Sequence, residues 1–491
     1  MKKTNKETYN IGFHFIKATE GFEDRMAILS PRGTISHAKL RNLVFRYASL
    51  FQSEGIDQQS CAAVHTKFLY NSLAIPLALS LLGAKWCQAT PLLFQSKEID
   101  ITAQILDSNG PLAPGLSPDK LIKIIPSVVS SPADLPGDPS AFSGCSHPQD
   151  LQMITHSSGT TGIPKFMGWS FENVMRWQWI AADIEGDPIP VVANMFPMLS
   201  ILGWFYNLCA IIQGGTIVFS FQHDYLIQHG VNHIVGSPIQ FSHLIQGQPA
   251  PPRPDSVTAH ITGGAVPDML QEKLARFFNR RFAIYGSTEA GPVCISEIGP
   301  SPSKERALGR PLDNVQVRIL DENGLVCPPG QEGIVSIKTP LLVNGYIGNP
   351  EATKQIFKDN WFYPGDIGKI NDNGELVLVG RVNDILNLGG HKLNAADIDG
   401  NIQAIEGVSD GICFVETEET GIAMIAAVVQ ISETADPKEV TEAVRKACQK
   451  VIRSKQLFHG HIYIVDHIPR NESGKPLRRE CRNLINRLQA R

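Results

Sequence analysis

Hydrophobic positions near the start of the chain recur at helical spacing and then gather into short runs. Between Leu40 and Leu50 apolar residues follow one another every three or four positions, and a glycine comes soon after. This spacing predicts an amphipathic helix that ends at the glycine. Residues 60–65 and 84–90 are short apolar runs typical of strands, and the apolar stretch 71–83 between them predicts a helix. Strand, helix and strand in this order predict a parallel sheet covered by helices.

The same alternation continues through the centre of the chain. Strands are predicted at residues 151–154, 191–196, 216–219, 233–235, 259–262 and 281–284, and helices at residues 170–184 and 202–213. Polar turns that contain glycine follow three of these strands, at residues 155–165, 262–267 and 285–291. Because ligands of doubly wound sheets bind beyond the carboxyl ends of the strands, we expect these three turns to meet at one crevice.

Two changes of pattern divide the chain into domains. From residue 309 onward, Asn323-Gly324 and Asn373-Gly374 stand between apolar runs and predict β-hairpins. Beyond residue 380, helical and strand patterns alternate again to the end of the chain. We therefore expect an α/β protein with a large domain of helix-covered sheets over residues 1–380. This domain includes a β-rich subdomain over residues 309–380, and a small α+β domain follows over residues 381–491.

The composition is that of a globular protein and gives no support for a nucleic-acid or membrane partner. Of the 491 residues, 43% are hydrophobic and 19% are charged, and the net charge of −4 comes without any basic run. The most apolar long stretch, residues 201–219, contains Asn207 and Gln213, which favours buried core over a membrane span. Residues 1–10 lack the apolar segment of a secretory signal. The nine cysteines form no Cys-x-x-Cys pair, so we expect reduced thiols, no structural zinc and a cytoplasmic location.

The first candidate site is the turn over residues 155–165. Its predicted phosphate-binding residues are Ser157, Ser158, Gly159, Thr160, Thr161, Gly162 and Lys165. Glycines allow a close approach of the backbone, successive N–H groups form a nest for anions, and hydroxyls and a lysine add donors. The spacing differs from the P-loop of kinases and GTPases, which needs Gly-x-x-x-x-Gly-Lys-Ser/Thr. The residues therefore predict a loop that grips a polyphosphate, and a solvated linker is the alternative.

Five further residues have side chains suited to the same nucleotide. Glu289 lies in a tight polar turn, and a carboxylate beside a triphosphate is a natural ligand of Mg²⁺; the alternative is a surface glutamate. Tyr285 has the shape to stack on a nucleobase or to pack in the core. Asp366 suits a pair of ribose hydroxyls, and Arg381 suits a ligand between domains or is a solvated charge. Lys475 stands on a Ser-Gly turn near the end of the chain, where most lysines are simply solvated.

Taken together, these motifs resemble the adenylate-forming (ANL) superfamily of acyl- and aryl-CoA synthetases, peptide-synthetase adenylation domains and beetle luciferases. The matching segments are residues 157–165, 285–289, 365–366, 380–384 and 473–475, in this order, within a resemblance that covers nearly the whole chain. The resemblance implies a large domain, a hinge and a mobile C-terminal lid. It also implies that MgATP and a small carboxylic acid form an acyl-adenylate and pyrophosphate. The thiol of coenzyme A or of a phosphopantetheinyl carrier protein then takes the acyl group.

The resemblance also implies roles for single residues. Mg²⁺ on Glu289 and the ammonium of Lys475 would offset charge at the α-phosphate, while Thr161 would hold the leaving pyrophosphate. The ATP and AMP contacts would be Ser157, Ser158, Gly159, Thr160, Thr161, Gly162, Lys165, Gly263, Gly264, Ala265, Tyr285, Gly286, Ser287, Thr288, Asp366, Arg381 and Lys392. The hinge would be Asn383 and Asp384, and the thiol tunnel would include Gly389 and Gly390. The acyl pocket would be lined by Ser200, Ile201, Trp204, Val235 and Gly236.

The chain departs from the family pattern at several of these positions. Ser200 replaces a histidine that gates the acyl pocket in many members, and Ala283 replaces an asparagine near the adenine. Ile201 stands where amino-acid-activating domains carry an aspartate, so a substrate ammonium would stay unpaired at a cost of several kcal/mol. We therefore expect an acid other than an amino acid. Trp204 and Phe205 either limit the acyl chain or belong to the core.

Three functions remain open from the sequence. The first is an acyl-CoA synthetase, and the second is a freestanding adenylation enzyme that loads a carrier protein. The third, a binding protein without turnover, is disfavoured by the intact Lys475, Glu289 and Asp366. A phosphotransferase would release ADP, whereas an adenylate-forming enzyme releases AMP.

Overall fold

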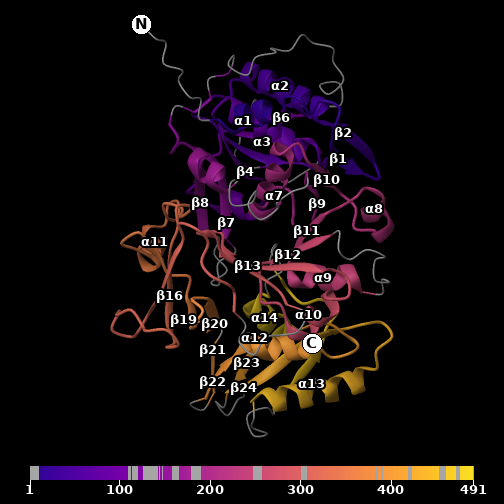
Figure 1. Cartoon of the computed structure of the whole chain (residues 1–491), viewed down its shortest axis with the longest axis vertical. Helices are drawn as coiled ribbons and strands as arrows, with labels where there is room; N and C mark the ends of the chain where they lie inside the picture. Colours follow the sequence, from indigo (N-terminus) through magenta and orange to yellow (C-terminus); the bar gives the residue numbers. More distant parts are fainter. Residues whose placement is uncertain are drawn as a thin grey trace. The chain divides into compact units, whose positions relative to one another are not determined.

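The computed structural model has an α/β fold, as predicted, and the chain divides into two compact units (Figure 1). It describes residues 10–108, 112, 120–124, 142, 144–145, 147–157, 165–177, 189–246, 257–299, 307–381, 385–388, 391–417, 423–452, 461–470 and 476–489. Unit 1 comprises Met1–Val235, Thr288–Gly291 and Pro340–Phe357, and unit 2 comprises Gly236–Ser287, Pro292–Thr339 and Lys358–Arg491. The predicted division into domains at residue 380 stays a prediction.

The first sheet of unit 1 carries the predicted phosphate loop. Its strands are β3 (Cys61–His65), β4 (Lys85–Gln88), β5 (Ala103–Leu106), β6 (Leu121–Lys123), β7 (Leu151–Ser157) and β8 (Lys165–Ser170), in the spatial order β6-β5-β3-β4-β7-β8. All neighbours run parallel except β7 and β8. The helix α3 (Asn71–Leu81) connects β3 to β4, so the predicted strand–helix–strand unit is confirmed.

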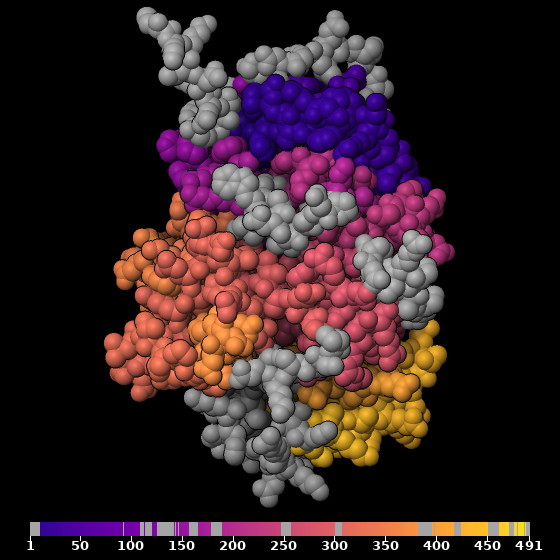
Figure 2. Space-filling view, viewed as in Figure 1, coloured from indigo at the N-terminus to yellow at the C-terminus, as the bar shows by residue number. Residues whose placement is uncertain are grey.

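A second group of strands in unit 1 packs with helices over the same apolar core. Its strands are β1 (Met26–Ser30), β2 (Gly33–Ser36), β9 (Val191–Asn194), β10 (Thr216–Val218) and β11 (His233–Gly236), in the order β11-β9-β10-β1-β2. The helices of unit 1 include α1 (Ile11–Ala18), α2 (His37–Ser53), α4 (Pro91–Gln95), α7 (Ile201–Ile212), α8 (His223–Gln228) and α11 (Pro350–Ile356). α2 and α7 are close to the predicted helices, and both contribute buried residues to the core. α11 has no buried residue and lies on the surface, in orange at the left of Figure 2.

Ser170 begins a helical segment over residues 171–177, as predicted. Its hydroxyl accepts a hydrogen bond from the Asn173 N–H at 3.2 Å, which is the contact of an N-cap residue. Ser170 is also the last residue of β8, so the chain passes from strand to helix without a loop.

Unit 2 begins with strands and short helices that position the other predicted turns. These are α9 (Pro238–Ile245), β12 (Thr258–Thr262), α10 (Asp268–Leu274), β13 (Arg280–Ser287) and β14 (Gly291–Glu297). β12 and β13 are parallel, and Thr262 pairs with Ile284 in their register. The turns after β12 and β13 therefore leave the carboxyl ends of neighbouring strands.

The predicted β-rich segment is an antiparallel sheet. Its strands are β15 (Gln316–Leu320), β16 (Gly333–Lys338), β17 (Phe357–Lys358), β18 (Trp361–Phe362), β19 (Asp366–Ile370) and β20 (Leu376–Arg381). The hairpin predicted at Asn373-Gly374 joins β19 to β20, and Gly374 has the positive φ of 75° that its turn requires. At Asn323-Gly324 the two arms share a single bridge, between Leu320 and Val326, and β15 also pairs along its length with β16.

The C-terminal part of unit 2 has the predicted α+β pattern. Its elements are β21 (Ile385–Leu388), β22 (His391–Asn394), α12 (Ala395–Gln403), β23 (Val408–Thr417), β24 (Ala423–Ile431), α13 (Pro437–Ile452), β25 (Ile462–Ile464) and α14 (Arg478–Gln489). Apolar residues of α12 and α13 pack on one face of the sheet β23-β24-β25, and α14 packs on the other face. None of the helices in the described ranges is long and apolar enough to cross a membrane.

Candidate functional site

The two ends of the predicted phosphate loop lie side by side. Ser157 ends β7, Lys165 begins β8, and the two residues pair in the antiparallel register. Residues 158–164 are outside the described part of the chain, and so is the side chain of Ser157. Because β7 runs parallel to β4, the loop leaves the sheet at the carboxyl end of a parallel strand, where doubly wound folds bind ligands.

Glu289 is held in unit 1 by contacts from a segment far along the chain. Its side chain is only 9% exposed. Its backbone carbonyl accepts a hydrogen bond from the Val343 N–H at 3.0 Å, and its Oε1 accepts one from the Tyr346 hydroxyl at 2.7 Å. Neither Val343 nor Tyr346 was identified from the sequence. The one signal there was the glycine before Tyr346, and the structure shows its reason, a φ of 124° at Gly345.

The same tyrosine contacts the end of the phosphate loop. The Lys165 Nζ lies 5.0 Å from the centroid of the Tyr346 ring, a cation–π contact. The Ile347 N–H also donates to the Phe166 carbonyl at 2.7 Å. The structure therefore brings together two predicted residues, Lys165 and Glu289, through one residue that the prediction missed.

The Tyr346 hydroxyl remains a hydrogen-bond donor at any ordinary pH. Burial raises the pKa of Tyr346 far above its usual value, and the negative charge of Glu289 raises it further. The hydrogen bond to Glu289 adds to the same shift because it favours the protonated phenol. A neutral phenol beside a carboxylate leaves the full negative charge of that carboxylate available to a cation.

The donor set around Glu289 fits Mg²⁺. Oε1 accepts the Tyr346 hydrogen bond, and no described residue donates to Oε2. No group of three or more His, Cys, Asp or Glu side chains surrounds it among the described residues. This suits Mg²⁺, which binds through one or two carboxylates plus phosphate oxygens and retains water, and it does not suit an all-protein metal cage.

A second cluster, in unit 2, joins three predicted nucleotide-binding residues. Asp366 begins β19 and pairs in register with Arg381, the last residue of β20. The Asp366 carboxylate is 1% exposed, and its Oδ1 lies 2.7 Å from the Arg381 Nε. Its Oδ2 accepts a hydrogen bond from the Tyr285 hydroxyl at 2.5 Å. Burial raises the pKa of Tyr285 well above its usual value, and the charge of Asp366 adds to this shift.

The turns after β12 and β13 leave their backbones accessible. Gly263 has a φ of 88°, which favours glycine, and a Cβ on Gly264 would meet only the Pro238 ring, at 3.7 Å and beyond. Ala265 and Gly286 are exposed, and Ser287 and Thr288 are partly buried. The remaining predicted turn, over residues 155–165, belongs to unit 1, so the expected meeting of all three turns stays a prediction.

The residues predicted for the acyl pocket have structural partners. Ser200 caps α7, where its hydroxyl accepts from the Gly203 N–H at 3.1 Å and donates to the Pro197 carbonyl at 2.7 Å. Trp204 is 1% exposed and packs edge-on against Trp86, with ring centroids 5.1 Å apart. Of the two interpretations of Trp204, buried core is the one its contacts support.

The neighbouring residues predicted for the acyl pocket differ in how deeply they are buried. Phe205 is fully buried and stacks on Trp177 with ring centroids 4.8 Å apart. Val235, at the end of β11, is fully buried, whereas Ile201 is half-buried at the start of α7. Gly236 follows Val235 and begins unit 2.

Several predicted residues lie outside the described part of the chain. They are Ser158, Gly159, Thr160, Thr161, Gly162, Asn383, Asp384, Gly389, Gly390 and Lys475, together with the side chain of Lys392. The residues that flank Lys475 are described. Arg470 and Pro476 form a β-bridge, and the Leu477 N–H donates to the Pro469 carbonyl at 2.9 Å.

Ion pairs that were not predicted anchor both sides of the Lys475 segment. Arg470 binds Asp410 through two hydrogen bonds, at 2.6 Å from Nε and 2.5 Å from Nη2. Arg478 binds Asp399, with its Nη2 at 2.5 Å from Oδ2. The residues on either side of this segment are therefore fixed to β23 through Asp410 and to α12 through Asp399.

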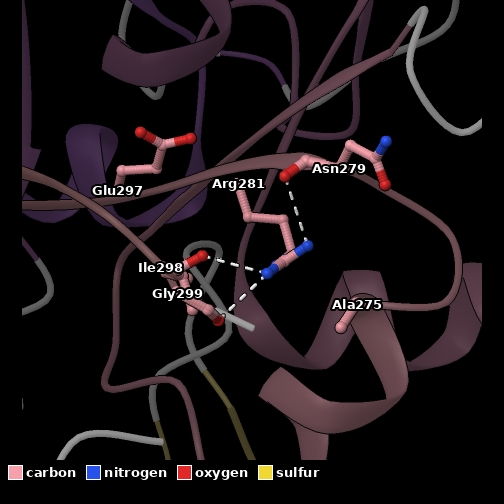
Figure 3. Close-up of a pocket in the computed structure, with 6 residues that line it drawn as sticks. All are labelled: Ala275, Asn279, Arg281, Glu297, Ile298 and Gly299. Carbon is pink, nitrogen blue, oxygen red and sulfur yellow. Dashed lines mark hydrogen bonds between the residues drawn. The ribbon is translucent and has the colours of Figure 1, made fainter. Parts of the chain in front are cut away.

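A cavity of about 430 Å³ lies at the start of β13, whereas Tyr285 lies near the end of the same strand. Arg281 fills its wall, and the Arg281 guanidinium donates to the Ile298 and Gly299 carbonyls, both at 3.0 Å (Figure 3). Glu297 points away from this guanidinium in the same view. The arginine ties the start of β13 to the end of β14, and the cavity is separate from the candidate site.

Comparison with known proteins gives the class of this fold and site. The sequence pattern of the family described as AMP-binding enzyme matches residues 15–347, so the chain belongs to this family. It is 31% identical to the 4-coumarate–CoA ligase of Pinus taeda over 378 residues, which cover 69% of this chain and 66% of that protein. It is 26% identical to the oxalate–CoA ligase of Arabidopsis thaliana over 93% of this chain and 95% of that protein.

The fold is shared with a solved structure of the same kind. The o-succinylbenzoate coenzyme A synthetase MenE of Bacillus subtilis, in complex with ATP and a magnesium ion, superposes with a TM-score of 0.80. The two chains are 20% identical, and the match covers 96% of this chain and 99% of that chain. The resemblance to the adenylate-forming superfamily is confirmed. The predicted enzyme class, an AMP-forming acid–thiol ligase, is confirmed with it.

Proposed function

We propose that this protein adenylates a small carboxylic acid other than an amino acid and then transfers the acyl group to coenzyme A. The observation that carries the proposal is the family match together with the two clusters around Glu289 and Asp366. The curated relatives are named as CoA ligases, which favours coenzyme A as the acceptor. Ile201, an apolar residue at the start of α7, favours acids without an ammonium group.

The proposed chemistry assigns a task to each residue. The acid attacks the α-phosphorus of ATP, and pyrophosphate leaves. Mg²⁺ would neutralise charge that develops on the phosphate oxygens, and Glu289 would hold this ion through Oε2, to which no described residue donates. Lys165 and the hydroxyls of residues 157–161 hold the leaving pyrophosphate, and Lys475 donates to the reacting oxygens. Asp366, fixed by Arg381 and Tyr285, accepts hydrogen bonds from the ribose hydroxyls.

The decisive experiment is ATP–pyrophosphate exchange with a panel of aryl, short-chain and dicarboxylic acids, with α-amino acids as a comparison. Exchange with a non-amino acid, and AMP as the nucleotide product, would support the proposal. If no acid of any class drives exchange, or if the product is ADP, the proposed function is wrong.

The second candidate function is loading of a phosphopantetheinyl carrier protein. It uses the same first half-reaction, so only the acceptor separates it from the leading proposal. Acyl transfer from the identified acid to free coenzyme A and to a holo-carrier protein, compared at equal thiol concentration, decides between them. Faster transfer to the carrier would favour the second candidate.

We also propose a cytoplasmic location. None of the nine cysteines, all of which lie in the described ranges, forms a disulfide bond, and eight of them are buried. Free buried thiols are typical of reducing compartments. Fractionation of the native host, followed by immunodetection, tests this location directly.

A further inference from the structure

Tyr346 has three well-defined contacts on three sides of its ring and hydroxyl. The hydroxyl donates to Glu289, the ring face lies under the Lys165 ammonium, and the ring packs edge-on against Phe357 at 5.8 Å and 77°. The side chain is buried. A single residue therefore contacts both the expected magnesium ligand and the cation that ends the phosphate loop.

The backbone around Tyr346 is equally constrained. Its N–H donates to the Thr353 hydroxyl at 2.9 Å, and the next N–H, of Ile347, donates to the Phe166 carbonyl at 2.7 Å. A Cβ at Gly345 would lie 2.5 Å from the Thr353 methyl group, so only glycine fits there. These contacts fix the position from which the tyrosine side chain extends.

We propose that Tyr346 is a positioning residue that sets the geometry between the magnesium carboxylate of Glu289 and the pyrophosphate cation Lys165. The inference rests on the proposed function, because it takes the metal role of Glu289 from there. The hydroxyl occupies Oε1, which would leave Oε2 to bind the metal. The ring face holds the lysine ammonium without competing for its charge.

The chemistry of a tyrosine suits this task better than that of a charged donor. A lysine or arginine on Oε1 would neutralise the carboxylate and weaken its attraction for Mg²⁺, whereas a neutral phenol orients it and leaves its charge intact. Hydrogen-bond partners that orient a metal ligand typically contribute about 10–100-fold to metal affinity. The aromatic face attracts the ammonium through its quadrupole but accepts no proton, so Lys165 keeps all three N–H donors for phosphate.

Two substitutions separate the hydroxyl from the ring. Tyr346→Phe removes the hydrogen bond to Glu289 and retains the surface under Lys165, whereas Tyr346→Leu removes both. Tyr47→Phe is a matched control, since Tyr47 is also a buried tyrosine of unit 1, and its hydroxyl donates to Asn71 Oδ1 at 2.6 Å. All three variants lose one buried hydrogen bond, but only two lose it at the site.

The primary measurement is a Mn²⁺ titration, followed by electron paramagnetic resonance, of the full chain saturated with α,β-methylene-ATP. We expect Tyr346→Phe to weaken Mn²⁺ binding at least about 10-fold, with nucleotide affinity in excess metal unchanged. Tyr346→Leu should weaken both metal and nucleotide binding. Tyr47→Phe should leave both as in the wild type. Wild-type Mn²⁺ affinity in Tyr346→Phe, or an equal loss in Tyr47→Phe, would overturn the proposal.

A double-mutant cycle tests whether the effect passes through Glu289. In the background of Glu289→Gln, Tyr346→Phe should have no further effect on Mn²⁺ affinity, and a full additional loss would contradict the proposed role. Thermal unfolding of each variant reports folding separately, and the conservative Phe variant retains the test if the Leu variant does not fold. Metal and nucleotide binding do not require an acid substrate. The positioning role can therefore hold or fail independently of the acid-panel assay that tests the proposed function.

Discussion

The cluster of Tyr285, Asp366 and Arg381 supports a prediction in which stability and nucleotide affinity change separately. Tyr285→Phe removes the hydroxyl that donates to Asp366 Oδ2 at 2.5 Å and keeps the ring that is expected to wall the adenine. Because Asp366 is 1% exposed, water cannot replace the lost donor freely. A hydrogen bond to a charged group contributes about 1.5–3 kcal/mol, so we expect the nucleotide-free protein to lose about 2 kcal/mol of unfolding free energy.

ATP affinity should respond differently to this substitution. If the ribose hydroxyls bind Asp366, they supply the donor that Tyr285→Phe has lost, so the dissociation constant should stay within about threefold of the wild type. Asp366→Asn removes the acceptor charge itself and should weaken ATP binding about 10-fold or more, which corresponds to about 1.4 kcal/mol. The Arg381 side chain is 36% exposed, so water screens the cation left behind.

The assays are urea unfolding followed by tryptophan fluorescence, and isothermal titration with ATP in excess Mg²⁺. Tyr47→Phe is a matched control, since it removes another buried tyrosine hydroxyl and leaves the predicted ATP contacts in place. If Tyr285→Phe weakened ATP binding as much as Asp366→Asn, the tyrosine hydroxyl would be the nucleotide contact. The assignment of Asp366 to the ribose would then be refuted.

Three further predictions concern other parts of the chain. Lys475→Ala should slow adenylation about 10²–10³-fold, as removal of one transition-state donor does. It should spare thiol transfer from a supplied acyl-adenylate, because the mobile lid that the family resemblance implies would have turned Lys475 away by then. Equal loss in both half-reactions would contradict this lid motion. Arg470→Gln should destabilise the protein by about 3 kcal/mol in urea unfolding, because it leaves the buried Asp410 charge unpaired, and a loss below 1 kcal/mol would contradict this anchoring role. His37 is buried, its Nε2 contacts the Gly215 carbonyl at 2.9 Å, and burial lowers its pKa below 6.5. The unfolded chain therefore binds a proton at His37 that the native chain does not, so this residue should lower stability as pH drops below about 6.5, by at most about 1.4 kcal/mol at pH 5.5. Because burial also lowers the pKa of His14, His37→Gln should reduce, and not abolish, the pH dependence of unfolding measured at pH 5.5 and 7.5.

Much of the local architecture was predictable because its causes are local. The helix Asn71–Leu81 and the flanking strands follow from apolar runs. Ser170 begins a helix because its hydroxyl satisfies the Asn173 N–H three residues later. The turn at Asn373-Gly374 needs a positive φ, and its composition shows this directly. The turn at Asn323-Gly324 has the same composition, but its arms share a single bridge, and the longer pairing of β15 is with β16. Turn chemistry alone does not decide which further strand a hairpin arm pairs with.

By itself, the sequence determined the class of this protein and the residue types of its site, since spaced motifs and amphipathic periods are properties of the chain order. Tertiary structure alone decided the partners of those residues. Glu289 meets Tyr346, which is 57 residues away, and Tyr285 meets Asp366, which is 81 residues away. The tertiary structure also decided that Trp204 is packed in the core. Burial and hydrogen bonding between distant segments depend on how the strands pair and the helices pack, and no local pattern of residues encodes that choice.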